Sequence, residues 1–177
     1  MRQALSLALL LTLALAALPA LAVELQENYY PVGRFAVAGP GHDVQYQTSI
    51  VEQGSSAVIH HEFAMTDISG DTKVMVLYVD LGSAPDPATV DAMFQDTFAG
   101  IAREPMDNGS ATLAGREATQ WEGRPTLDFT LLEQTPAGER WLKVRAVVAG
   151  DRYYVLQASA PDARTCDKVL QSFWIAP

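Results

Sequence analysis

The feature that most constrains this fold is a short apolar run at residues 73–80. Its sequence, KVMVLYVD, is apolar at both odd and even positions between its charged ends. Successive side chains of a strand point to opposite faces, so both faces of a strand here are apolar. Such strands lie inside sheets that are covered on both sides. We therefore expect the chain to supply a covering layer for each face of one sheet.

One covering layer is predicted between residues 85 and 103, where the apolar period changes to that of a helix. Asp86 is a favourable N-cap, and Pro87 fits the first helical position, where its missing N–H has no cost. We expect residues 104–113 to form a loop. The predicted apolar face of the helix consists of Val90, Met93, Phe94, Thr97, Phe98 and Ile101.

A second helix is predicted from Pro161 to about Phe173. Cys166, Val169 and Leu170 recur there at helical spacing, so the only cysteine falls on the apolar stripe. One cysteine cannot form an internal disulfide. The stripe favours a small buried residue, and the alternative is an exposed thiol that reacts or links two copies.

The other segments alternate as strands do. The hairpin turn at Pro136-Ala137-Gly138 sets Phe129 opposite Val144 and Asp128 opposite Arg145, so that like residues face like. Gly150-Asp151 is the next predicted hairpin loop. The expected strands lie at 33–37, 46–51, 57–65, 73–80 and 115–121, followed by an antiparallel meander over 126–159.

Four motifs lie along this order of elements: Gly33–Val37 ahead of Gly39-Pro40, Gly115–Ala118, Asp151–Leu156 and Ser172-Phe173. With them the chain resembles the PsbP-like family, which includes the photosystem subunit PsbP and the exported bacterial proteins DcrB and LpqN. The resemblance implies an α+β fold, a three-layer α/β/α sandwich around a mainly antiparallel sheet. It implies one domain over 33–177, and we expect residues 23–32, with Tyr29-Tyr30-Pro31, to form an N-terminal arm before it. Family members resemble accessory and binding proteins, and no catalytic, cofactor-binding or metal-binding residue carries over.

Residues 1–22 have the pattern of a secretory signal peptide. Arg2 precedes a continuous Leu- and Ala-rich stretch that ends in Pro19 and Ala20-Leu21-Ala22. The alternative is an uncleaved membrane anchor, since the stretch approaches the length that spans a bilayer. Pro19 and the small residues after it favour cleavage, so we expect an exported protein, periplasmic or secreted, without membrane insertion after cleavage.

Charge excludes one class of partner. The chain of 177 residues has a formal net charge of −9, and its acidic residues are interspersed with aromatic and β-branched ones. Phosphate backbones and anionic headgroups are not attracted to such a surface, so we expect no nucleic-acid partner. The partner is expected to be a protein or a small molecule, and the protein a monomer.

His60 and Glu62 are the residues that most suggest a metal site. Alternation in the predicted strand places them on one face, and His61 on the other. They supply two ligands, whereas structural zinc asks for four, and His42 is a candidate for a third. The alternative is a solvated His–Glu pair. We therefore predict no bound metal or other cofactor.

Asp128 and Arg145, with Lys143 and Thr130 beside them, form a polar row on one sheet face. If helices cover both faces, these charges are partly buried and must be paired. Pairing is the favoured interpretation, and a ligand-facing pocket is the alternative.

No nucleophile elbow, P-loop or dinucleotide-binding motif occurs. Asn108-Gly109-Ser110 fits the glycosylation pattern, but an ordinary turn is favoured. We interpret the chain as an exported, non-enzymatic binding or accessory protein of unknown ligand. One alternative is a metal-dependent or acid–base enzyme that uses His60, Glu62 and Asp128. Another is an envelope protein-interaction module whose partner docks around Tyr29-Tyr30.

The first prediction concerns processing. Because the small-residue pattern ends at Ala22, N-terminal sequencing of the exported protein is expected to begin at Val23. Recovery of intact Met1 in the membrane fraction would contradict the signal-peptide interpretation.

Overall fold

A computed structural model describes residues 23–41, 43–53, 56–67 and 69–176. The predicted signal peptide lies outside the described residues, as does His42. Among the described helices, none is long and apolar enough to cross a membrane.

The described residues form two antiparallel sheets. The larger has the strand order β3-β4-β5-β9-β8-β7-β6, and the smaller has the order β1-β2-β10. The strands of the large sheet are β3 (Asp43–Gln53), β4 (Ser56–Thr66), β5 (Lys73–Asp80), β6 (Ala111–Trp121), β7 (Arg124–Thr135), β8 (Gly138–Ala149) and β9 (Arg152–Ala160). Those of the small sheet are β1 (Leu25–Tyr30), β2 (Phe35–Pro40) and β10 (Trp174–Ile175).

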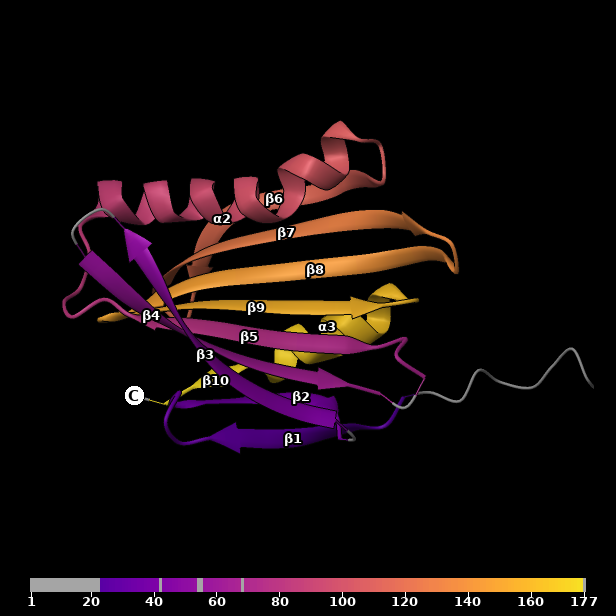
Figure 1. The fold of residues 1–177 in the computed structure, drawn as a ribbon, viewed down its shortest axis with the longest axis horizontal. Coiled ribbons are helices and arrows are strands. Elements are labelled where there is room, and N and C mark those ends of the chain that lie inside the picture. Colours follow the sequence, from indigo (N-terminus) through magenta and orange to yellow (C-terminus); the bar gives the residue numbers. More distant parts are fainter. Residues whose placement is uncertain (1–22, 42, 54–55, 68, 177) are drawn as a thin grey trace, which may run out of the picture.

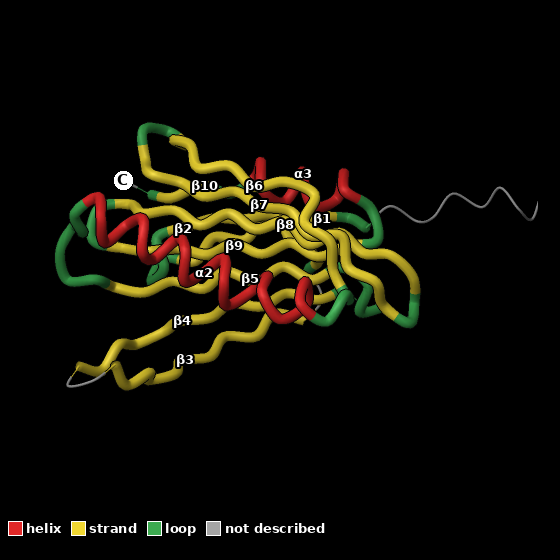
Figure 2. Tube along the Cα trace, turned by 90° about the horizontal axis from the view of Figure 1, so that it is seen from above, coloured by secondary structure: helices red, strands yellow, loops and turns green. Residues whose placement is uncertain are grey.

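Three layers result, as predicted. Helix α2 (Pro87–Asp107) lies on one face of the large sheet, and helix α3 (Ala163–Ser172) lies on the other (Figures 1 and 2). The small sheet shares the layer of α3, because residues of both pack in one core cluster against β4, β5 and β9. The fold is therefore an α+β three-layer sandwich whose second covering layer is part helix and part sheet.

Helix α2 begins as predicted. The Asp86 carboxylate accepts the Thr89 N–H at 2.9 Å, and Pro87 occupies the first helical turn. Its end differs from the prediction, because the helix continues through Pro105 to Asp107, where we expected a loop. Proline in the last turn removes one backbone donor, and the helix still closes because the Asn108 N–H donates to the Glu104 carbonyl at 3.1 Å.

The expected turn follows at once. The Ser110 N–H donates to the Asn108 side chain at 2.9 Å, and Gly109 has a φ of +75°, a conformation that glycine adopts without strain. This geometry is an ordinary turn after a helix end.

Helix α3 confirms the predicted placement of Cys166. The side chain is fully buried, 0% exposed, beside Val169 and Leu170. Burial raises the pKa of its thiol to about 11, so the thiolate is scarce at neutral pH. Cys166 is therefore a small core residue.

The hairpin register is also confirmed. Phe129 lies opposite Val144, and Asp128 lies opposite Arg145. Arg145 donates to both Asp128 carboxylate oxygens, at 2.9 and 2.8 Å, and to the Leu170 carbonyl of α3 at 3.3 Å. These two charges are paired beneath α3, in agreement with the favoured interpretation of the polar row.

The small sheet incorporates residues that were expected to form the N-terminal arm. Strand β1 pairs with β2, and the short strand β10, which was not predicted, pairs with the other side of β2. The Tyr154 hydroxyl donates to the Gly33 carbonyl at 2.9 Å, and the Ala38 N–H donates to the Ser172 hydroxyl at 2.8 Å. The sheet is thus fixed to both β9 and α3.

Strand β5 is central, as predicted, but its two faces differ. On the side of α3, Val74, Val76 and Tyr78 are buried. On the side of α2, Val79 is buried but Met75 and Leu77 are only half-buried, because α2 packs mainly on β6, β7 and β8. The expected cover is therefore incomplete on one face.

Candidate functional site: an apolar pocket beside helix α2

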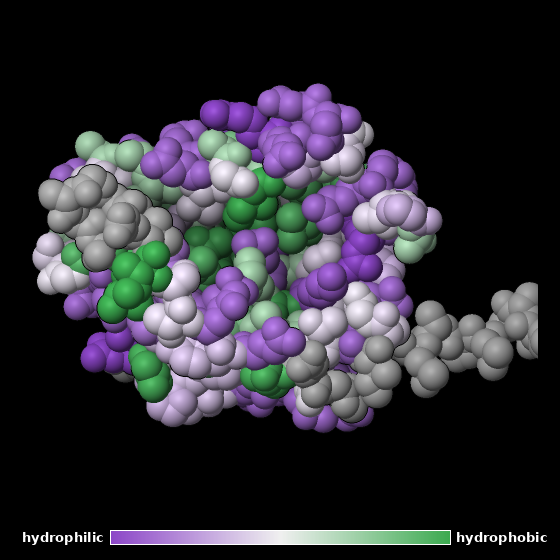
Figure 3. Space-filling model, in the orientation of Figure 1, coloured by the Kyte–Doolittle hydropathy of each residue, from purple (hydrophilic) through white to green (hydrophobic). Residues whose placement is uncertain are grey.

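A pocket of about 550 Å³ opens where α2 leaves the sheet uncovered. Its floor comes from β4, β5 and β9, and its wall comes from α2. In the space-filling view, hydrophobic side chains line a hollow below the polar outer surface of the helix (Figure 3). The lining residues are Val58, His60, Leu77, Val79, Leu81, Thr89, Met93, Asp96, Thr97, Gly100, Ile101, Tyr153, Val155 and Gln157.

The pocket exists because α2 is held to one side. Phe98 packs edge-on against Phe129 of β7, with ring centroids 5.2 Å apart. The Arg116 guanidinium of β6 lies 4.1 Å from the centre of the Phe98 ring. These contacts hold the helix over β6–β8. The apolar side chains of Leu77, Val79 and Val155 on β5 and β9 lie beside it.

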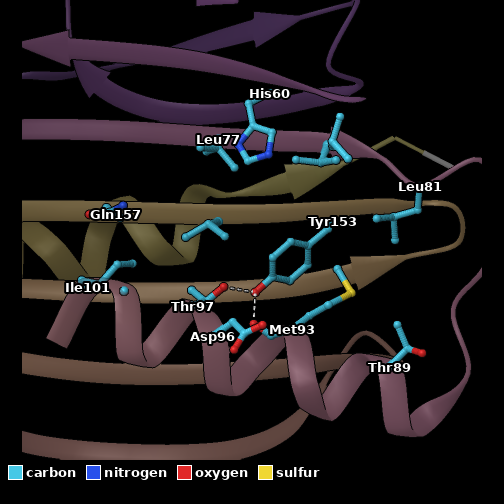
Figure 4. A pocket seen from close by; sticks show the side chains of 14 residues that line it. His60, Leu77, Leu81, Thr89, Met93, Asp96, Thr97, Ile101, Tyr153 and Gln157 are labelled. Carbon is cyan, nitrogen blue, oxygen red and sulfur yellow. Dashed lines mark hydrogen bonds between the residues drawn. The ribbon is translucent and has the colours of Figure 1, made fainter. Parts of the chain in front are cut away.

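Tyr153 fixes the inner edge of the pocket. Its hydroxyl lies 2.5 Å from the Thr97 hydroxyl and donates to the Met93 carbonyl at 3.4 Å, so both groups of α2 hold it (Figure 4). Burial raises the pKa of Tyr153 to about 12, against a smaller lowering by the Thr97 hydrogen bond. The phenol is neutral at neutral pH, and its hydrogen bonds position the helix.

Few polar groups line the remaining wall. His60 of β4 lies across the pocket from the helix (Figure 4). The other polar residues of this wall are Gln157 of β9 and Asp96 and Thr89 of α2. Asp96 is the one carboxylate among the lining residues, and no lysine or arginine is among them. The pocket is thus an apolar surface with a few polar groups, the usual composition of a small-molecule site.

The residues of the predicted enzyme alternative do not meet. His60 and Glu62 do share a face, but the Glu62 carboxylate accepts a hydrogen bond from Gln47 at 2.9 Å. Asp128 lies on the opposite face of the sheet, where it binds Arg145. The three side chains therefore cannot act on one substrate in this arrangement.

His61 lies on the other face, as alternation predicts. Its Nδ1 is 2.8 Å from the Tyr46 hydroxyl, and its ring stacks on Tyr78 with centroids 4.5 Å apart. Within the described part of the chain, no group of three or more His, Cys, Asp or Glu side chains is placed to hold a metal ion.

This pocket was not predicted from the sequence, although two signals were present. The doubly apolar strand at 73–80 required cover on both faces. Thr97 and Gly100 are small residues on the side of α2 that faces it, and they leave the space unfilled.

The metal alternative gives a thermal prediction. A site occupied at 100 times its Kd stabilises the folded state by about 2.7 kcal/mol, which raises Tm by roughly 5–10 °C in a domain of this size. Since His60 and Glu62 supply only two ligands, zinc, manganese or calcium added to chelator-treated protein is expected to change Tm little. A rise of several degrees that His60→Ala with Glu62→Ala abolishes would instead establish a metal site.

The fold can be compared with those of solved structures. The chain is similar to cyanobacterial PsbP from Synechocystis sp. PCC 6803, with 14% identity, a TM-score of 0.54, and coverage of 89% of this chain and 95% of that one. A protein from Bacteroides thetaiotaomicron matches with 11% identity and a TM-score of 0.43 over 86% of this chain and 48% of that one. A Pseudomonas aeruginosa protein of unknown function matches with 9% identity and a TM-score of 0.36 over 78% and 84%.

No protein-family model and no curated protein sequence matches the chain. At these identities the likeness concerns the fold. The architecture expected from the short motifs is thereby confirmed: the chain has a PsbP-like fold.

Proposed function

We propose that this protein is an exported, non-enzymatic binding or accessory protein that holds a small apolar molecule in the pocket beside α2. The observation that carries the proposal is the apolar pocket floor formed by half-buried Leu77 with Val79 and Val155, beside a helix that packs mainly on β6, β7 and β8. When a ligand covers apolar surface in a concave site and removes it from water, the free energy of binding becomes more favourable by about 25 cal/mol for each Å².

The dimensions suit one small ligand. A volume of about 550 Å³ falls inside the usual range for small-molecule sites, about 300–1,000 Å³. Each buried methylene contributes about 0.8 kcal/mol before the costs of binding are subtracted. An alkyl chain or a fused aromatic ring system therefore fits the proposal.

Charge narrows the ligand class. Asp96 is the carboxylate at the pocket, no lysine or arginine lines it, and the chain has a net charge of −9. An anionic headgroup placed there finds no lysine or arginine to pair with and is repelled by Asp96 and by the net negative charge of the chain. We therefore propose a neutral or cationic apolar ligand rather than a fatty-acid anion.

Two observations support a binding role without catalysis. Tyr153 is neutral and already hydrogen-bonded to α2, and Asp128 is committed to Arg145 on the far face. Export is proposed from the signal-peptide pattern at residues 1–22.

A second candidate function, a protein-interaction module, has its own observation. Tyr29 and Trp174 are 56% and 44% exposed on the small sheet, with ring centroids 6.5 Å apart. Both lie opposite Ala36 in the register, on the face away from the core. Exposed aromatic pairs are typical of interfaces. The two candidates differ in whether binding depends on the pocket.

Filling the pocket tests the proposal. Leu77→Trp places a larger ring on the floor, so the affinity for the neutral fluorescent probe N-phenyl-1-naphthylamine is expected to fall about tenfold or more, a loss of at least about 1.4 kcal/mol. The matched control is Met75→Trp, two residues away on the same face of β5 and outside the pocket lining. Fluorescence titration measures both, and circular dichroism checks that both variants fold.

Competition then tests the ligand class. Dodecanol and dodecylamine are expected to displace the probe at lower concentrations than dodecanoate. Equal loss of affinity in the two tryptophan variants, or no probe binding by the unaltered protein, would contradict the proposed site. Stronger displacement by dodecanoate would contradict the charge argument alone.

A further inference from the structure

The two edges of the large sheet are built differently. Strand β6, at one edge, has a register irregularity between Leu113 and Gly115, followed by the charged residues Arg116 and Glu117. Bulges and charges are the usual means by which an edge strand avoids pairing with another chain. Strand β3, at the other edge, has neither over residues 44–50, whose sequence is VQYQTSI.

Strand β3 also carries an exposed apolar stripe. Val44, Tyr46 and Ile50 are 47%, 52% and 69% exposed, and Ile59, opposite Ile50 on β4, is 49% exposed. All four side chains lie on the face of the sheet that carries the small sheet. In the view of Figure 2, β3 is the outermost strand of the sheet. Among the described strands its one neighbour is β4, so no other described strand covers its outer edge.

The stripe is complementary to itself in one register. Two copies of β3 that pair antiparallel, with Gln47 at the twofold axis, set Val44 opposite Ile50 and Tyr46 opposite Thr48. Directly opposed residues share a face, so the apolar stripes of the two copies become continuous. An axis at Thr48 instead sets Val44 against the charged Glu52.

We infer that β3 is a dimerisation edge, and that a second copy of this chain pairs with it antiparallel about Gln47. The contact is isologous, since each copy supplies the same surface, and the symmetry closes it at two chains. No charged residue occurs between positions 44 and 50, so no like charges are opposed along that stretch. The inferred state is a dimer, in place of the monomer expected from the sequence.

Sedimentation equilibrium of the full mature chain tests this inference. The protein concentration is varied between about 1 and 100 μM, the range of weak specific association. The salt concentration is about 0.15 M, at which charges are screened beyond about 8 Å. The unaltered protein is expected to dimerise. Ile50→Lys should weaken dimerisation about tenfold or more, because it sets an ammonium against Val44 of the other copy. Its high exposure makes the fold tolerant of the change.

A second variant tests the register. Adding Val44→Glu to Ile50→Lys sets each new carboxylate opposite the new ammonium of the other copy, so dimerisation should return. The matched control is Leu113→Lys on the other edge strand, which should leave the dimer intact. A monomeric unaltered protein, an unaffected Ile50→Lys variant, a double variant that stays monomeric, or a dimer lost in Leu113→Lys would each overturn the inference.

Discussion

The position of α2 over β6, β7 and β8 determines which part of this sheet face is left to form a pocket. Phe98 against Phe129 and the Tyr153 hydroxyl against Thr97 hold the helix at that position. A helix about 10 Å wide covers only two or three strands of a sheet whose strands are about 4.8 Å apart. The apolar surface of β5 and β9 is therefore left beside the helix, where it forms the floor of a pocket.

The opposite face is closed by a different arrangement. Phe35 of the small sheet is fully buried, and its ring packs against those of Tyr78, Tyr154 and Phe173. The small sheet and α3 together are wide enough to cover β5 and β9 on this side. Packed aromatic rings fill the face of β5 and β9 that α3 and the small sheet cover. The α2 face of the same strands has a pocket, so a ligand has room there.

Features that depend on local sequence could be predicted. The start of α2 follows from the chemistry of Asp86 and Pro87, and the pairing of Asp128 with Arg145 follows from the length of one turn. The burial of Cys166 follows from helical period. In each case residues close in sequence specify the result.

Features that depend on distant segments could not be predicted. The pairing of β10 with β2 joins the last residues to the first strands, and no local period indicates it. The pocket was not predicted because the apolar pattern at 73–80 indicates that both faces of the strand are covered, but it does not indicate which strands the helix packs on. His60 and Asp128 were grouped as one site because sequence spacing does not tell which face of the sheet each side chain occupies.

The most direct test of the pocket is NMR of methyl-labelled protein with N-phenyl-1-naphthylamine. Leu77 and Val79 line the pocket, whereas Val74 and Val76, on the same strand, face the closed core. The account predicts that the probe shifts the methyl signals of Leu77, Val79 and Val155 and leaves those of Val74 and Val76 unchanged. Shifts confined to Val44, Ile50 and Ile59, or an absence of shifts at Leu77 and Val155 with probe bound, would contradict it.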